Sequence, residues 1–189
     1  MLSAPQRPGS TRDALLDAAY HAAVAGDWAH VRMADVAVAA GVSRQTLYKA
    51  FGSKDALAEA VAIREGARFV EGTVEVVRHT AGDPGTAAGA AVRWALGEAA
   101  ANPLVEAALT DETAGLLPLL TTRSGALLVT LRDGIADALR RRWPDLPPDE
   151  TAWVAEVGVR LAVSALVVPT EPVDTTADHV ATLVRRLLT

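Results

Sequence analysis

Apolar residues recur at intervals of three and four along most of the chain, and this spacing constrains the fold more than any other feature. The first stretch of this kind contains Ala14, Leu15, Ala18, Ala19, Ala22 and Ala23. Strand signals are nearly missing, because there is no Asn-Gly hairpin sequence and little strict alternation. Abundant alanine and leucine also favour helix. The sequence therefore predicts an all-α fold.

Glycine, proline and capping residues divide this pattern into segments. The clearest break is Ala81-Gly82-Asp83-Pro84-Gly85. We expect a disordered arm at 1–9, a small three-helix lobe at 10–52, a connecting helix at 53–80 and a larger helical lobe at 81–189. Within these, the expected helices begin at Ser10 or Thr11 and end before Gly26, and then span 33–40, 43–51, 53–78, 84–101, 103–109, 112–120, 123–142, 148–168 and 175–188.

Composition excludes several classes of protein. Half of the 189 residues are hydrophobic but only 4% are aromatic, so the core must consist mostly of Ala, Val and Leu. Cysteine is absent, which excludes disulfides, zinc–thiolate sites and thiol nucleophiles. No signal peptide and no apolar run of about 18 residues is present, so we expect a cytoplasmic protein without a membrane span.

Charge is unevenly distributed. The net charge is −5, yet residues 32–54 carry the four cations Arg32, Arg44, Lys49 and Lys54 against Asp35 alone. An acidic chain with one basic patch predicts a local contact with a polyanion, although an excess this small also arises by chance.

The segment 33–51 reads as two short helices joined by a turn at Gly41. On a helical wheel, Leu47, Ala50 and Phe51 share one arc and can pack against the preceding helices. The opposite arc carries Arg44, Gln45, Tyr48 and Lys49, whose long polar side chains suit base edges and phosphates in a major groove. Ser43 and Ser53 each cap a helix, and helix N-termini bind phosphate oxygens well. Lys54 lies in such a first turn, where a bound anion would offset its repulsion from the helix dipole.

The run "DVAVAAGVSRQTLYKAFGSKDAL" resembles the DNA-binding segment of the TetR family of transcriptional regulators. Matches in spacing are Val36-Ala37, Ala40-Gly41-Val42-Ser43, Thr46-Leu47-Tyr48, Phe51 and Ser53-Lys54-Asp55-Leu57. The resemblance covers about 45 residues and implies a helix-turn-helix lobe, followed by a helical lobe for ligand binding and dimerisation. It also implies a homodimeric repressor that a small molecule releases from a palindromic double-stranded DNA operator.

Carried over by position, the DNA contacts would come from Arg32, Ser43, Arg44, Gln45, Thr46, Tyr48, Lys49 and Lys54. Two departures stand out. Val31 and Arg32 replace the threonine that often begins the second helix, so a cap is lost or Arg32 makes a phosphate contact instead. Ala50 replaces a Tyr or His, which removes one phosphate contact. The alternative for Thr46 is a local backbone contact, for Tyr48 it is packing between helices, and for Arg44 and Lys49 it is plain solvation.

The second lobe carries two apolar stripes at helical spacing. With the two-fold symmetry that a palindrome demands, they predict a four-helix dimer interface, and the alternative is core within one chain. The interface residues expected are Trp153, Val157, Leu161, Ala165, Val180, Leu183, Val184 and Leu187. Leucine excess in 94–131 further predicts a site for an apolar, acyl-like effector, although such a stretch is more often plain core. The expected lining residues are Trp94, Leu104, Leu117, Leu120, Leu128 and Trp153.

Other functions have less support in the sequence. His21, His30, His79 and His179 show no metal-ligand spacing, and neither G-x-S-x-G nor G-x-x-x-x-G-K-[ST] occurs. We therefore expect no catalysis, metal or cofactor. An activator or ligand-independent regulator with the same fold, and a helical protein-interaction module without DNA binding, are the open alternatives.

Overall fold

The computed structural model describes residues 10–25, 28–110 and 116–188, and within these ranges it contains helices and no strand. The predicted all-α fold is confirmed. In chain order the elements are α1 (Thr11–Val24), the 3₁₀ helix η1 (Trp28–His30), α2 (Met33–Ala39), α3 (Arg44–Phe51), α4 (Lys54–His79), α5 (Pro84–Ala100), α6 (Pro103–Thr110), α7 (Leu117–Leu120), α8 (Gly125–Arg142), α9 (Pro148–Val167) and α10 (Val173–Leu187).

Side-chain caps explain where several helices begin. Ser10, Ser43, Ser53 and Asp83 each accept a hydrogen bond from the backbone N–H three residues later. At α1 the cap is reciprocal, because Asp13 accepts from both the hydroxyl and the N–H of Ser10. These bonds, that of the Ser10 hydroxyl first, lower the pKa of Asp13. The capping residues thus locate helix starts that local sequence can predict.

Several predicted helix boundaries differ from the structure by one or more residues, and the helix expected at 123–142 begins at Gly125. The helix expected at 112–120 is reduced to the four residues of α7 in the described part of the chain, and 111–115 lies outside it, as does the predicted arm at 1–9. The last helix begins at Val173 instead of 175, because Pro172 occupies the N-cap position and fixes a backbone angle that is compatible with a helix start.

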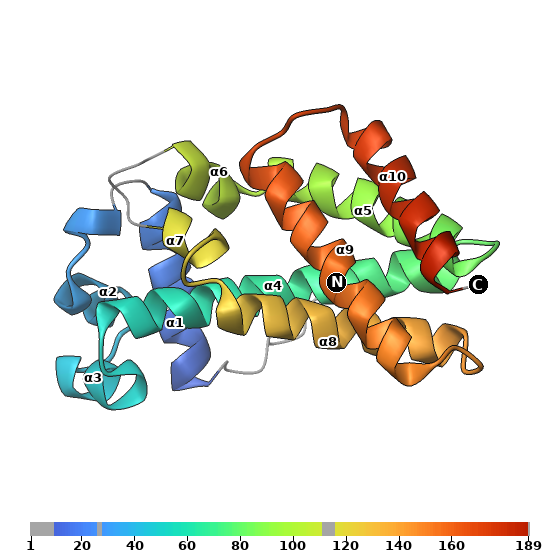
Figure 1. Ribbon diagram of the computed structural model, residues 1–189. Coiled ribbons are helices and arrows are strands. Elements are labelled where there is room, and N and C mark those ends of the chain that lie inside the picture. The colour runs from blue at the N-terminus through green and yellow to red at the C-terminus, as the bar shows by residue number, and fades with distance from the viewer. Residues whose placement is uncertain (1–9, 26–27, 111–115, 189) are drawn as a thin grey trace, which may run out of the picture.

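Figure 1 shows two regions joined by a long helix. We call α1, η1, α2 and α3 the head, and α5 to α10 the body. Helix α4 has 26 residues, a length of about 40 Å at 1.5 Å per residue, and runs from the head into the body, where it packs against α8 and α5. Helix α10 lies along α5. Their close approach requires Gly85, since a Cβ there would lie 2.5 Å from the carbonyl oxygen of Ala181.

The apolar core of the head does not stop at the end of α3. Leu15, Leu16 and Leu47 of the head form one cluster with Leu57 of α4. The same cluster includes Ala108, Leu116 and Leu119 from α6, the residue preceding α7, and α7. Packing therefore crosses the boundary predicted at 52, and a displacement of α6 or α7 would be felt inside the head.

Ion pairs fasten α10 to α5 on the far side of the body. Arg93 donates to Asp174 at 2.5 Å, and this bond, the largest cause, raises the pKa of Arg93. Arg185 donates to both oxygens of Asp83, at 3.2 and 3.3 Å. Because the side chains are largely exposed, these contacts fix the register of the helices more than they add stability.

Candidate functional site

The turn between α2 and α3 sets the angle at which α3 projects from the head. Gly41 adopts a left-handed φ of 68°, which favours glycine. Its N–H donates to the carbonyl of Val38 at 3.0 Å, and the N–H of Val42 donates to that of Ala37 at 2.9 Å. This pair of bonds is the Schellman arrangement that ends a helix sharply. The sequence Ala40-Gly41-Val42-Ser43 thus forms the turn of a helix-turn-helix unit.

Helix α3 has one buried side and one exposed side, as the helical wheel predicts, but Ala50, which was expected on the buried side, is exposed. Leu47 is fully buried in the head core, and Phe51 packs against that core beneath the guanidinium of Arg12. Tyr48 is 45% exposed, which is high for so large a side chain. The other polar residues expected on this side, Arg44, Gln45, Thr46 and Lys49, are exposed as well.

Some predicted DNA contacts already have partners within the head. The hydroxyls of Ser43 and Thr46 are hydrogen-bonded at 2.8 Å, and the N–H of Thr46 donates to Ser43 at 3.1 Å, so both side chains take part in the cap of α3. Arg32 is the N-cap residue of α2 and makes no side-chain cap bond. Its Nε instead donates to Asp35 at 3.2 Å on the exposed surface.

Lys54 connects the start of α4 to the short helix η1. Its ammonium donates to the carbonyl of Ala29 at 2.8 Å and lies 5.3 Å from the centre of the Trp28 ring. Trp28 is buried. The ammonium is therefore balanced by a carbonyl and an aromatic face within the head, and its contact with a phosphate stays a prediction.

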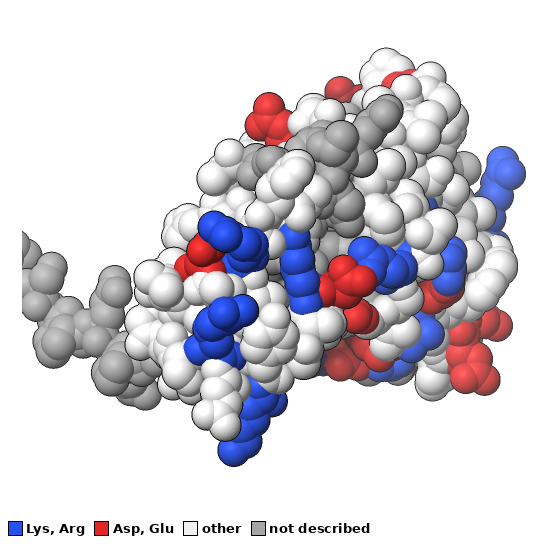
Figure 2. Space-filling view, turned by 90° about the vertical axis from the view of Figure 1, so that its left-hand side faces the viewer, with Lys and Arg blue, Asp and Glu red and all other residues white. Residues whose placement is uncertain are grey.

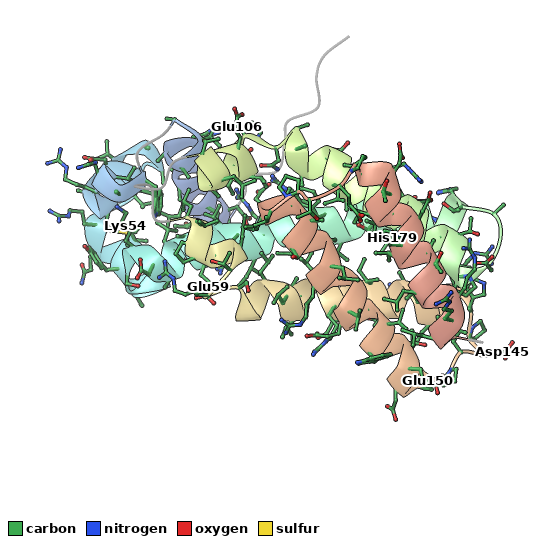
Figure 3. All side chains as sticks on the ribbon, turned by 45° about the horizontal axis from the view of Figure 1, so that its top comes forward. Lys54, Glu59, Glu106, Asp145, Glu150 and His179 are labelled. Carbon is green, nitrogen blue, oxygen red and sulfur yellow. The ribbon has the colours of Figure 1, made fainter. Side chains whose placement is uncertain are left out.

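Cations lie at the end of the molecule that the head forms. Lys and Arg side chains project from the end formed by the head (Figure 2). Lys54 lies at that end, whereas Asp145 and Glu150 lie at the opposite end (Figure 3). The exposed face of α3 is therefore the part of the described surface that combines a protruding helix, cations and hydrogen-bonding side chains, which suits a major groove.

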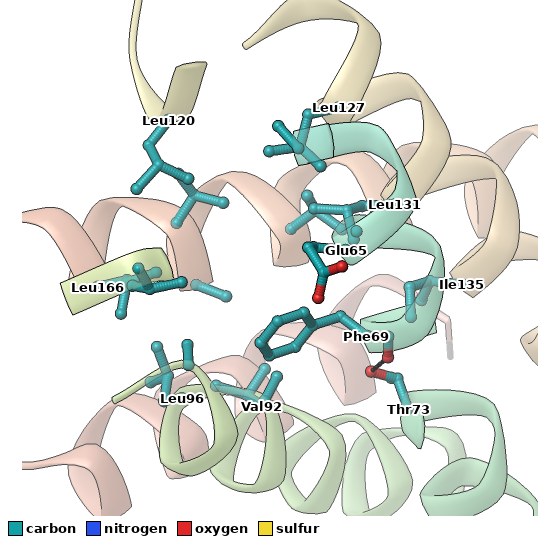
Figure 4. A pocket seen from close by; sticks show the side chains of 18 of the residues that line it. Glu65, Phe69, Thr73, Val92, Leu96, Leu120, Leu127, Leu131, Ile135 and Leu166 are labelled. Carbon is teal, nitrogen blue, oxygen red and sulfur yellow. Dashed lines mark hydrogen bonds between the residues drawn. The ribbon is translucent and has the colours of Figure 1, made fainter. Parts of the chain in front are cut away.

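A cavity of about 200 Å³ lies inside the body. Helices α4, α5, α8 and α9 line most of it, and Ala19, Ala23 and Trp28 extend the lining into the head. In Figure 4 the aliphatic side chains Val92, Leu96, Leu131 and Leu166 converge on this space. A largely apolar cavity suits a ligand with a large apolar part.

The predicted lining was only partly right. Leu104 and Leu120 line the cavity, but Trp94, Leu117, Leu128 and Trp153 do not. The indole of Trp94 packs edge-on against Phe69, with 6.2 Å between ring centres, and against α4 at Gly72. Leu128 follows the lining residue Leu127 and so faces another direction on α8. Trp153 is 53% exposed on the outside of α9, which excludes it from the interior.

Sequence reasoning missed the α4 side of the cavity. Val61, Glu65, Phe69, Thr73 and Val77 recur every four residues and all line it. The signal was present, because a glutamate within a stripe of core residues on a helix is unusual. Contributions from Ala19 and Trp28 have no comparable signal, since they depend on how the head packs against α6 and α7.

The predicted dimer stripes also need correction. Val180 and Val184 are buried in a cluster with Val92 and Val154, and Ala165 and Leu187 pack against that cluster, so much of the α10 stripe is intrachain core. The α9 stripe differs. In it, Trp153 and Leu161 are 53% and 42% exposed and Val157 is half-buried, as is Leu183 of the α10 stripe.

Two other kinds of site are absent from the described ranges. No group of three or more His, Asp or Glu is placed to hold a metal ion among those residues. Nor does any described helix combine the length and apolar character that crossing a bilayer requires.

The helix-turn-helix head and the hollow helical body define a class, the helix-turn-helix DNA-binding regulators. Residues 15–61 match the family described as bacterial regulatory proteins, tetR family, and 83–186 match the bacterial tetracyclin repressor, C-terminal domain. The chain is 34% identical over 180 residues to the HTH-type transcriptional regulator AlkX of Mycobacterium tuberculosis (strain ATCC 25618 / H37Rv), covering 94% of this chain and 83% of the relative. The chain belongs to the TetR family and is a DNA-binding transcriptional repressor.

Solved structures agree with this assignment. The TetR family repressor AlkX from Dietzia sp. strain DQ12-45-1b, implicated in biodegradation of n-alkanes, is 28% identical with a TM-score of 0.80, and the match covers 97% of both chains. The R. erythropolis transcriptional repressor QsdR is 19% identical with a TM-score of 0.68 and 94% coverage of both chains, which shows the fold alone. The family resemblance predicted from residues 35–57 is confirmed.

Proposed function

We propose that this repressor reads a palindromic operator with α3 and leaves it when an aliphatic molecule fills the body cavity. The observation that carries the DNA part is the exposed polar side of α3, held in place by the buried Leu47. In this proposal Arg44 and Gln45 contact base edges, and Tyr48, Lys49 and Lys54 contact phosphates. Because its target is chromosomal DNA, we place its action in the cytoplasm.

The apolar lining of the cavity supports an aliphatic effector. The Dietzia repressor, described as implicated in biodegradation of n-alkanes, favours the same chemical class. We therefore propose a long-chain aliphatic molecule, an n-alkane or an oxidised derivative of one. A site with so few polar groups gains most of its binding free energy from buried apolar area.

Two chains of contacts support coupling between the cavity and the head. Trp28 lines the cavity, and the Lys54 ammonium lies over the Trp28 ring in a cation–π contact. Arg64 of α4 donates to Asp17 at 2.7 Å and to the carbonyl of Leu16 at 3.3 Å, both on α1. An effector that displaces Trp28 or α4 would shift α1 and the start of α4, and so change the position of α3 on DNA. Such an effector releases the protein from DNA only if it binds the shifted position of the head more tightly than the DNA-bound position.

Dimerisation through α9 completes the proposal. Trp153 and Leu161 are exposed on α9, together with Val168 just beyond its end. Val129 of α8 borders this face, since Arg132, one turn later, pairs with Glu156 of α9. A second copy of the chain would cover these side chains and would give the two-fold symmetry that a palindrome requires.

Selection from random duplex DNA tests this function. The parent should select a palindrome and bind it in a mobility-shift assay, and a decyl-chain compound (decane, decanol or decanoate) should release it. Arg44→Ala should lose discrimination at one position of each half-site, by roughly 1–3 kcal/mol. Arg141→Ala removes an exposed cation at the far end of α8 and should select the parental sequence. An unchanged consensus with Arg44→Ala contradicts base reading by this residue.

A further inference from the structure

Glu65 is the one charged side chain among the described residues that line the cavity. It lies on the inner side of α4 and is only 7% exposed. Figure 4 shows its carboxylate between Leu131 and Phe69, in a lining that is largely hydrocarbon. A buried charge surrounded by aliphatic groups determines what polar group a ligand can bring there.

The charge of Glu65 is balanced from outside the cavity. Arg68 Nη1 donates to Oε1 at 2.9 Å and to Oε2 at 3.2 Å, and Arg64 Nε lies 3.4 Å from Oε1. Neither arginine is among the lining residues. A carboxylate offers about four acceptor positions, so these contacts leave capacity for a further hydrogen bond. The Glu65 carboxylate can therefore accept a hydrogen bond from a ligand in the cavity, although its charge is already balanced by the two arginines.

Thr73 adds a second acceptor to the same wall. Its hydroxyl donates to the backbone carbonyl of Phe69 at 2.7 Å, so the hydroxyl hydrogen is already used. Only the oxygen lone pairs of Thr73 remain for a ligand. Glu65 and Thr73 thus both accept hydrogen bonds and offer no donor, and the other polar group of a described lining side chain is the indole N–H of Trp28, where the lining extends into the head.

We propose that the cavity selects a neutral aliphatic chain ending in a hydroxyl, a primary alcohol, and that Glu65 accepts the hydrogen bond of this hydroxyl. This rests on the proposed function, in which the cavity holds an aliphatic effector. A hydroxyl bonded to a carboxylate forms a short, charge-assisted hydrogen bond.

The same geometry disfavours charged head groups. The carboxylate of a fatty acid would lose its hydration in an apolar site and would find no donor on Glu65 or Thr73. An ammonium would add a positive charge that nothing balances, because Glu65 already pairs with Arg68. An alkane would leave the acceptors without a hydrogen bond, so it should bind more weakly than the alcohol of equal chain length.

Calorimetric titration of the full-length protein with decanol, decanoate and decane at pH 8 tests this selection. The parent should bind decanol at least about tenfold more tightly than decanoate, as expected from one charge-assisted hydrogen bond. Glu65→Gln keeps the shape but replaces the negative charge by an amide that can donate, so the preference for decanol should shrink about tenfold. Glu71→Gln removes an exposed charge from the same helix and should keep the parental preference.

The outcomes separate this proposal from the proposed function. Decanoate binding as tightly as decanol to the parent would overturn the selection but leave an aliphatic site in place. A preference that persists in Glu65→Gln, shown to be folded by its thermal transition, would overturn the role of Glu65. Should this variant not fold, the comparison of decanol with decanoate in the parent still decides the selection. If none of the three compounds binds the parent, the aliphatic effector itself is wrong.

Discussion

The head and the body use their apolar residues in different ways. In the head, Leu15 and Leu47 are completely buried and the exposed side of α3 is polar. In the body, the helices α5 to α10 surround a cavity of about 200 Å³ together with α4, and Trp153 and Leu161 remain exposed on α9. A helix that reads base edges must be held rigidly, whereas a ligand site must leave interior space unfilled. The contrast indicates that the packing of the head keeps its shape fixed, whereas the body leaves apolar surface available for a ligand inside and for another protein surface outside.

The largest expected effect comes from making the exposed apolar face of α9 in the body as polar as the outer surface of the head. Trp153→Glu combined with Leu161→Glu places charges on the exposed face of α9, so the protein should sediment as a monomer at micromolar concentration. Operator affinity should fall by roughly 10²–10⁴-fold, because two linked heads bind a palindrome far more tightly than one.

Val38→Glu is the matched control for that experiment. Val38 is the most exposed of the large hydrophobic residues of the head, so the variant adds one charge of the same sign outside the proposed interface. It should sediment like the parent. A double variant that also sediments as a dimer would place the interface elsewhere on the body.

The head could be predicted largely from sequence because its determinants are local. The spacing of Leu47 and Phe51, the cap at Ser43 and the turn at Gly41 all act within a few residues of one another. Lys54 shows the limit of such reasoning. Its bond to the carbonyl of Ala29 spans 25 residues, and no local pattern contains that contact.

The candidate ligand site was harder to predict because a cavity is a space between helices distant in sequence. A leucine-rich stretch indicates apolar surface but does not distinguish a filled interior from an open one, and Leu117 and Leu128 were assigned wrongly for this reason. Burial of Val180 and Val184 likewise follows from the position of α10 along α5, which periodicity alone does not specify. Glu65 was the residue from which the α4 side of the cavity could have been predicted, since it interrupts the buried stripe of α4.

The next largest effect compares how much stability is lost when a side chain is shortened in the packed core of the head and at the cavity of the body. Leu47→Ala removes a fully buried side chain from the head and should lower the free energy of unfolding by about 2–5 kcal/mol. Leu131→Ala should cost less, because this half-buried side chain already borders empty space and loses fewer contacts. Urea unfolding of both variants measures the difference. Equal losses would mean that the body is packed as tightly as the head.

The smallest effect compares two capping carboxylates by their dependence on pH. The N–H of Thr86, the largest cause, and then Arg185 lower the pKa of Asp83 from its ordinary 3.8, and Ser10 lowers that of Asp13. A lowered folded-state pKa adds stability that is present above the unfolded pKa and lost as pH falls through the folded value. Asp83→Asn and Asp13→Asn should therefore each lose less stability than the parent between about pH 5 and pH 2.

The two carboxylates should differ at neutral pH, because their partners differ. Asp13 bonds only within the first turn of its own helix, whereas Asp83 also holds Arg185 of α10. Asparagine caps a helix about as well as aspartate, so Asp83→Asn keeps the cap of α5 and loses mainly the charge that attracts Arg185. Its unfolding midpoint at pH 7 should fall slightly more than that of Asp13→Asn, with Asp145→Asn in an exposed loop as the control. The reverse order would show that local capping in the head matters more than the contact joining two helices of the body.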